Sequence, residues 1–92
     1  MNIKNNQRPG TIIDVRTPVE FMQGNAPGSI NIPLQDIRKK IPEIKNLTQP
    51  VILCCASGAR SAQATQLLSE QGVECINAGS WISLNYSEPK NV

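Results

Sequence analysis

The 92-residue sequence contains no histidine, and few of its residues are aromatic. Histidine is the usual general base for cysteine and serine nucleophiles and a common zinc ligand, so its absence removes the ordinary means of activating a nucleophile. The three cysteines include no Cys-x2-Cys pair, which argues against a zinc site. We therefore expect no metal and no cofactor, and any reactive thiol has to be activated by electrostatics alone.

The sequence also lacks the features that bind nucleic acids or membranes. A net charge of +2 is small, and Phe21, Trp81 and Tyr86 are too few to form a base-stacking platform. No stretch approaches the roughly 20 apolar residues of a membrane span. Residues 1–8 are polar and lack the apolar core of a signal peptide, so we expect a cytoplasmic protein, or a periplasmic one if a leader has been removed.

The cysteine count is odd, and Cys54 and Cys55 are adjacent. A disulfide between neighbours requires a strained geometry, so a disulfide scaffold is not expected. If the strand that precedes them continues, the two side chains point to opposite faces of the sheet. Cys75 is predicted to be a core residue of its own strand.

The hydrophobic pattern predicts a single α/β domain over residues 11–92, preceded by a loose lead-in over residues 1–10. Short apolar runs bounded by turn residues indicate strands. These strands are predicted over residues 11–15, 29–32, 51–54 and 74–76. Helical segments alternate with them, which favours a parallel sheet with right-handed crossovers.

The helices are predicted from their caps and their apolar spacing. Thr17 and Glu20 form a capping-box pattern, and Gly24 is expected to end the helix that follows. Apolar residues at spacings of three and four predict a second helix from residue 33, broken or kinked at Pro42. Two further helical segments are predicted over residues 60–71, with Gly72 as the C-cap, and over residues 81–84.

The loop after the third predicted strand is the segment most suited to carry a reaction. Cys55 is predicted to lie where the carboxyl end of a parallel strand meets the start of a helix, a position at which sites form. The backbone N–H groups of residues 56–61 would make a concave anion nest, and Gly58 permits the backbone angles this needs. Arg60 either adds positive charge or braces the loop. We therefore expect the pKa of the Cys55 thiol to lie below its ordinary value of about 8.5.

Plainer interpretations stay open for several of these residues. Cys54 and Cys55 could be ordinary buried thiols at the end of a strand, since free cysteine is among the most buried residue types. Asp14 and Arg16 could lie near the pocket. The favoured alternative is that Asp14 binds loop backbone while Arg16 pairs with Glu20 or braces a neighbour.

Four motifs in the correct order resemble the rhodanese family. The active-site signature of that family, Cys-x-x-Gly-x-Arg-Ser, is matched by Cys55, Ala56, Ser57, Gly58, Ala59, Arg60 and Ser61. Residues 13–16 together with Glu20 resemble the first conserved box, and residues 24–33 resemble the second. Residues 77–79 lie where the family has its glycine-rich closing motif. The compact length most resembles the small single-domain members.

The resemblance implies a three-layer α/β fold, with a small parallel sheet of about four or five strands flanked by helices, and thiosulfate sulfurtransferase activity. Cys55 would be the nucleophile, residues 56–61 the substrate-binding loop, and Asp14 and Arg16 supporting residues. In this reaction the thiolate attacks the outer sulfur of thiosulfate, sulfite leaves, and a persulfide forms. Cyanide, a small thiol or a thiol protein then accepts the sulfur. Thiolate attack needs no base once the thiol is ionised, which fits the missing histidine.

The sequence departs from the family pattern in three places. Asn25 stands where the second box usually has a histidine, and Ser80 stands where a second glycine is common. Ala56 and Ala59 leave the loop without an extra basic residue. Less positive charge implies weaker thiosulfate binding or a different sulfur donor.

Two other functions stay open. Counted from Cys54, the motif has the Cys-x5-Arg-Ser spacing of cysteine-dependent phosphatases, whose loop is one residue longer and fits a phosphate. That chemistry also needs a carboxylic acid on a mobile loop, and Asp14 and Asp36 are the only aspartates available. The other alternative is a non-catalytic rhodanese module for sulfur carriage or protein binding. Retention of the signature cysteine, glycine and arginine argues against an inactive domain, but it leaves sulfur carriage between protein partners open.

Overall fold

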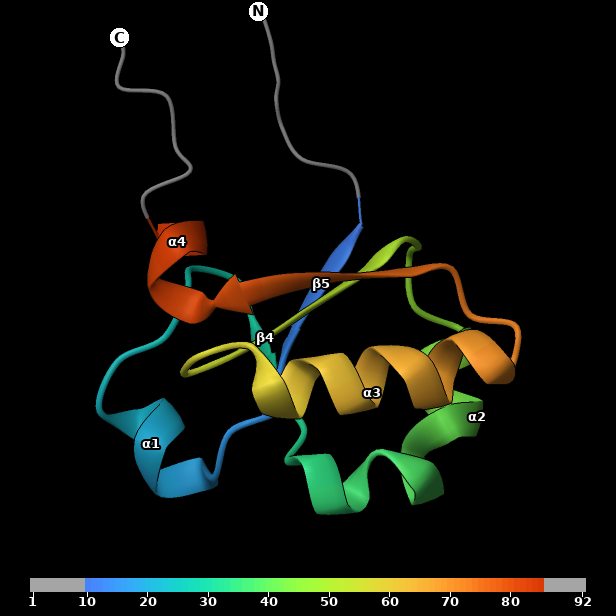
Figure 1. Ribbon diagram of the computed structural model, residues 1–92, viewed down its shortest axis with the longest axis horizontal. Helices are drawn as coiled ribbons and strands as arrows, with labels where there is room; N and C mark the ends of the chain where they lie inside the picture. The colour runs from blue at the N-terminus through green and yellow to red at the C-terminus, as the bar shows by residue number, and fades with distance from the viewer. Residues whose placement is uncertain (1–9, 86–92) are drawn as a thin grey trace, which may run out of the picture.

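The computed structural model describes residues 10–85. The predicted lead-in, apart from Gly10, and residues 86–92 of the predicted domain lie outside this range. The elements are β2 (Thr11–Asp14), α1 (Pro18–Met22), β3 (Ile30–Asn31), the 3-10 helices η1 (Leu34–Asp36) and η2 (Arg38–Lys40), α2 (Ile41–Lys45), β4 (Val51–Cys55), α3 (Ala59–Glu70), β5 (Cys75–Ser80) and α4 (Trp81–Asn85) (Figure 1).

The four strands form one parallel sheet in the order β3-β2-β4-β5. This confirms the predicted parallel α/β architecture. All five residues of the central strand β4 are buried. A strand covered on both faces reads as a continuous apolar run rather than an alternating one, which is why the segment Val51–Cys55 could be recognised from its sequence.

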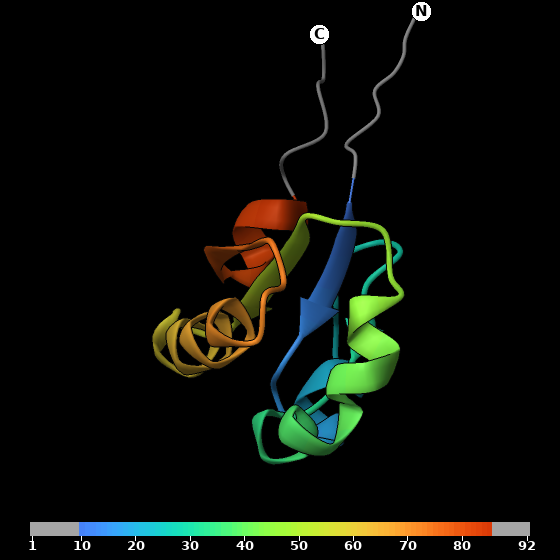
Figure 2. The ribbon, with the colours of Figure 1, turned by 90° about the vertical axis from the view of Figure 1, so that its right-hand side faces the viewer.

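One face of the sheet supports the main core. Val51, Leu53 and Cys55, alternate residues of β4, belong to a single buried cluster that also contains Ile44 of α2 and Leu68 of α3. Because alternate strand residues point the same way, α2 and α3 both pack on this face (Figure 2). The connections from β3 to β4 and from β4 to β5 cross the sheet in the same direction. Because parallel crossover connections share one handedness, they place α2 and α3 on the same face of the sheet.

The opposite face holds a buried ion pair. Asp14 and Arg16 are 0% and 4% exposed, and the Arg16 guanidinium carbon lies 4.6 Å from the centroid of the Trp81 ring. Trp81 begins α4, which lies across the sheet from α3 (Figure 1). Helices therefore cover both faces, and the sheet is the middle layer of three.

The first helix confirms its predicted capping box. The Thr17 hydroxyl accepts a hydrogen bond from the Glu20 N–H, and the Glu20 carboxylate accepts one from the Thr17 N–H. Two orphan donors of the first turn are thereby satisfied. The helix ends at Met22 with Gln23 as its C-cap, one residue before the expected Gly24.

The helix expected from residue 33 is replaced by three short pieces, η1, η2 and α2. Pro42 does not break a helix at this point. It lies in the first turn of α2, where the missing N–H costs no hydrogen bond. The apolar spacing was informative because Ile37 and Ile44 are both fully buried. The spacing could not distinguish one α-helix from a series of tight turns with a similar repeat.

The helix α3 ends as its sequence predicts. The N–H of Gly72 donates to the Ser69 carbonyl, and the N–H of Val73 donates to the Leu68 carbonyl, each at 3.0 Å. This is the Schellman pattern, and it requires the positive φ of Gly72, which is +86°. At 12 residues, α3 is the longest helix described, and none within residues 10–85 is long and apolar enough to cross a membrane.

Candidate active site

Cys55 is the last residue of β4, and the loop that follows turns back over its sulfur. The Gly58 N–H donates to Cys55 Sγ at 2.9 Å, and the Ser61 N–H does so at 3.5 Å. The Ser61 hydroxyl oxygen lies 3.4 Å from the same sulfur. Gly58 has a φ of +106°, in the left-handed region, so the glycine is required to turn its N–H toward the thiol.

These donors favour the ionised form of the thiol. Burial raises the pKa of Cys55, but hydrogen bonds from the Ser61 hydroxyl and from the backbone N–H groups of Ser61, Gly58 and Ser57 outweigh burial and lower it to about 7. Hydrogen bonds to the charged form stabilise it directly. About half of the thiol is therefore ionised near neutral pH without any histidine.

Cys54 has the opposite environment. It is fully buried on the other face of β4, where burial and the nearby Asp14 carboxylate raise its pKa to about 12, although Arg16 lowers it. A thiol with this pKa is protonated throughout the physiological range and a poor nucleophile. The geometry thus distinguishes two adjacent cysteines, and it agrees with the assignment of reactivity to Cys55.

Arg60 braces the loop against α1. Its guanidinium donates to both carboxylate oxygens of Glu20, at 2.8 and 3.0 Å. The hydrogen bond that Arg60 donates lowers the pKa of Glu20 to about 2, and the same bond to the Glu20 carboxylate raises the pKa of Arg60. Glu20 was predicted as part of the helix cap and as a possible partner of Arg16, not of Arg60. Its second role joins residues 40 positions apart, which no local sequence signal indicates.

Asp14 and Arg16 form a local clamp behind the site. The Arg16 Nη2 lies 2.7 Å from Asp14 Oδ2, and the Arg16 N–H donates to Asp14 Oδ1 at 3.1 Å. The carboxylate thus binds loop backbone, as the favoured interpretation expected. Pairing of Arg16 with Glu20 was wrong, because Arg16 turns toward Asp14 and the Gly24 carbonyl. The hydrogen bond that Arg16 donates to Asp14 raises the pKa of Arg16, and the clamp joins β2 to the segment after α1.

Asn77 lies in the segment 77–79 that resembles the closing motif, but its role in the site was not predicted. Its Oδ1 accepts a hydrogen bond from the Ser61 hydroxyl at 2.6 Å, and its Nδ2 donates to the Gly58 carbonyl at 3.3 Å. It therefore contacts Ser61 and Gly58, two of the three residues that donate to Cys55. β5 extends through Asn77, beyond the strand predicted over residues 74–76, and places this residue next to the strand that carries the thiol.

The model of the rhodanese-like domain matches residues 2–82 of the chain. The chain belongs to the rhodanese-like family. Over 69 residues it is 38% identical to thiosulfate sulfurtransferase PspE of Escherichia coli, covering 73% of this chain and 66% of that protein. It is also 39% identical over 61 residues to a sulfurtransferase of Allochromatium vinosum, covering 66% and 56%. The chain thus spans between half and two thirds of the length of these curated relatives.

Solved rhodanese structures have the same fold. A structure described as rhodanese with anions from E. coli superimposes with a TM-score of 0.73 at 34% identity, covering 87% of this chain and 94% of the other. This confirms the predicted rhodanese-like fold and places the chain in a family of sulfurtransferases. The role of Cys55 as nucleophile stays a prediction that the geometry supports.

The departures from the rhodanese pattern have local structural roles. Asn25, at the position of the usual histidine, donates from its side chain to the Phe21 carbonyl at 2.9 Å, beyond the end of α1. Ser80, at the position of the second glycine, ends β5, and its hydroxyl accepts the N–H of Ile82 at 3.2 Å in the first turn of α4. Ala56 and Ala59, the neutral loop residues, are exposed, as is Ser57.

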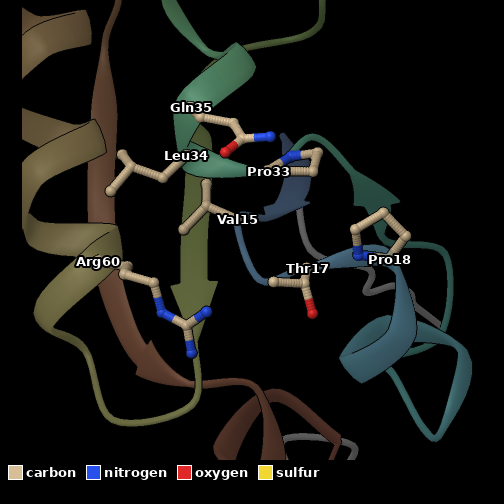
Figure 3. A pocket seen from close by; sticks show the side chains of 7 residues that line it. All are labelled: Val15, Thr17, Pro18, Pro33, Leu34, Gln35 and Arg60. Atoms are coloured by element: carbon tan, nitrogen blue, oxygen red, sulfur yellow. The ribbon is translucent and has the colours of Figure 1, made fainter.

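A pocket of about 310 Å³ lies beside the loop (Figure 3). Its lining is mostly apolar, with the Arg60 guanidinium reaching in from the start of α3; the lining residues are Val15, Thr17, Pro18, Pro33, Leu34, Gln35 and Arg60. Such a pocket can hold a small, mostly apolar molecule, because the Arg60 charge is already paired with Glu20. Within residues 10–85, no group of three or more cysteine, aspartate or glutamate side chains could hold a metal ion.

Proposed function

We propose that this rhodanese-like chain is a thiosulfate sulfurtransferase that carries the transferred sulfur as a persulfide on Cys55. In the first step the thiolate attacks the outer sulfur of thiosulfate. A new bond forms between Cys55 Sγ and the outer sulfur of thiosulfate. The sulfur–sulfur bond of thiosulfate breaks, and sulfite leaves with its electron pair. The persulfide retains the negative charge of the thiolate.

The observation that carries the proposal is the set of loop donors around one sulfur. The N–H of Gly58 lies 2.9 Å from Cys55 Sγ, and the pKa of this thiol is about 7. Thiolate attack is fastest when the thiol is ionised yet still basic enough to be a good nucleophile, which is the case for a pKa near ambient pH. The donors that hold the thiolate also face the sulfur on which the second sulfur would be carried.

In the second step a thiophilic acceptor takes the outer sulfur. Cyanide would attack that sulfur, the bond to Cys55 would break, and thiocyanate would leave while the thiolate is restored. A small thiol or a thiol protein would react in the same way and become a persulfide itself. Only 1% of Cys55 is exposed, whereas Ala56 beside it is exposed, so we propose that both substrates approach over the loop.

The test combines turnover with intact mass. Wild-type protein, Cys55→Ala and the matched control Cys54→Ala are each incubated with thiosulfate, and thiocyanate is measured after cyanide is added. We expect wild type and Cys54→Ala to turn over and to gain the mass of one sulfur atom. Cys55→Ala should do neither. Absence of both turnover and the mass gain in wild type would contradict the proposal.

The same variants separate the alternatives. A persulfide that forms without turnover to cyanide or to small thiols would indicate a sulfur carrier that serves a protein partner. The phosphatase alternative requires Cys54 as the nucleophile, yet that thiol is fully buried with a pKa of about 12, away from the loop donors. Phosphatase activity lost in Cys54→Ala and kept in Cys55→Ala would favour it.

A further inference from the structure

The Ser61 hydroxyl lies within reach of more hydrogen-bond acceptors than its single proton can bind. Its oxygen lies 2.6 Å from Asn77 Oδ1, 3.2 Å from the Gly58 carbonyl oxygen and 3.4 Å from Cys55 Sγ. A hydroxyl has a single proton to donate, together with lone pairs that accept. Only one of these three atoms can receive that proton at a time, and the shortest contact is with Asn77.

The Asn77 side chain is held with its oxygen toward Ser61. The Gly79 N–H donates to Asn77 Oδ1 at 3.0 Å, and the Asn77 amide nitrogen donates to the Gly58 carbonyl at 3.3 Å. Reversing the amide would place donor against donor and acceptor against acceptor. The hydrogen-bond network therefore determines the amide orientation, and the oxygen is a fixed acceptor for the Ser61 hydroxyl.

We propose that Asn77 is a positioning residue that competes with the Cys55 thiolate for the Ser61 hydroxyl proton and thereby sets how readily Cys55 ionises. In the neutral state the thiol S–H donates to the Ser61 oxygen while the hydroxyl donates to Asn77. On ionisation the thiol proton leaves to solvent. The Ser61 hydroxyl then turns from the amide oxygen to the thiolate, so the bond to Asn77 is lost.

The consequence for catalysis rests on the proposed function, whereas the competition itself does not. The hydroxyl bond that lowers the pKa of Cys55 is available only when Ser61 turns away from Asn77. Cys55 is therefore less acidic than it would be if Asn77 did not bind the Ser61 hydroxyl, and its thiolate is a more basic nucleophile.

The charged and titratable groups near Cys55 do not substitute for this competition. From α3, Arg60 acts on Cys55 through its charge, but its guanidinium is bound to Glu20 of α1. Behind β4, Asp14 is paired with Arg16. Neither pair contains a group that contacts Cys55 Sγ and could exchange a hydrogen bond with it on ionisation, whereas Ser61 does. The adjacent Cys54 thiol, with a pKa of about 12, is neutral at physiological pH.

The test is the pH dependence of Cys55 alkylation in four proteins of a double-mutant cycle. These are wild type, Asn77→Leu, Ser61→Ala and the double variant, each in a Cys54→Ala, Cys75→Ala background. Leucine keeps the branched shape of asparagine and removes the acceptor. We expect Asn77→Leu to lower the Cys55 pKa by about half a unit, because the hydroxyl is released to the thiolate. In the Ser61→Ala background the same substitution should leave the pKa unchanged.

Two further variants keep the result decisive. Asn77 is an exposed residue, so its replacement opens no core cavity, and Asn77→Ala provides a second variant should leucine perturb the fold. Ile76→Ala, at the exposed neighbouring position, is the matched control and should not move the pKa. A pKa that rises in Asn77→Leu, or that shifts equally with and without the Ser61 hydroxyl, would mean that Asn77 only holds the loop. Because alkylation requires no turnover, a failure of the proposed function would leave this measurement intact.

Discussion

Replacing Gly58 by alanine tests the backbone donor that holds the thiolate. Gly58 has a φ of +106°, a region that L-residues rarely adopt. A Cβ added there would meet the Gly79 Cα at 3.4 Å, which is an ordinary contact, so the cost comes from the backbone angle rather than from a clash. That cost is about 1–2 kcal/mol of folding stability if the loop keeps its shape.

The loop can relieve this strain only by turning the Gly58 N–H away from Cys55 Sγ, now 2.9 Å distant. A hydrogen bond to a charged group is worth about 1.5–3 kcal/mol, and one pKa unit corresponds to about 1.4 kcal/mol. The Cys55 pKa should therefore rise by about one to two units from its value of about 7. At pH 7 the ionised fraction would fall from about one half to about one tenth or less.

Gly72→Ala is the matched control for strain. Gly72 also has a positive φ, +86°, and an added Cβ there would meet nothing within 4 Å. It lies at the far end of α3, so its replacement should reduce stability by about 1 kcal/mol without changing the Cys55 pKa. The two variants separate a loss of stability from a loss of the donor.

The assay is the rate of iodoacetamide alkylation of Cys55 between pH 5 and pH 10 in a Cys54→Ala, Cys75→Ala background, with stability measured by urea unfolding. We expect the rate profile of Gly58→Ala to move to higher pH and that of Gly72→Ala to stay with the parent. If both variants lose stability while the Cys55 profile of Gly58→Ala stays near 7, the backbone N–H does not hold the thiolate. The explanation of its lowered pKa would then be wrong.

Three further predictions concern the scaffold around the site. The pKa of Glu20 is about 2 in the folded chain, against an ordinary value of 4.5. Its pairing with Arg60 should therefore stabilise the protein fully above pH 4.5, and this stabilisation should be lost as the pH falls through about 2. The difference in urea stability between wild type and Glu20→Gln should shrink over that range, and a constant difference would contradict the pairing. Thr17→Ala removes the capping box and should cost about 1 kcal/mol in urea unfolding. Leu68→Ala, at a fully buried core position, should cost about 2–5 kcal/mol in the same assay, and a cost below that of Thr17→Ala would argue against the packing described.

Local features of the fold could be predicted because the interactions responsible lie within a few residues. The capping box of Thr17 and Glu20 spans three positions, and the Schellman ending at Gly72 spans one helical turn. The buried run of β4 identified a central parallel strand. The segment that begins at residue 33 was mispredicted as a kinked helix, because tight turns bury the same apolar spacing and Pro42 is equally suited to starting a helix.

The candidate site was only partly predictable, because some of its interactions are local in the sequence and others join distant residues. The alternation of strand residues separated Cys55 from Cys54, and the loop signature indicated which side holds the donors. The partners of that loop come from distant parts of the chain. Glu20 lies 40 residues from Arg60, and Asn77 lies 16 residues from Ser61.

By itself the sequence determined the order of strands and helices, the family and the cysteine most suited to react, because periodicity, caps and a contiguous motif are local properties. The tertiary structure alone decided how that cysteine is held. Parallel pairing of β4 with β5 brings Asn77 to the Ser61 hydroxyl, and the position of α1 brings Glu20 to Arg60. The hydrogen bonds around a thiolate depend on distances of a few tenths of an ångström between elements, and such distances arise only when the sheet and its helices pack.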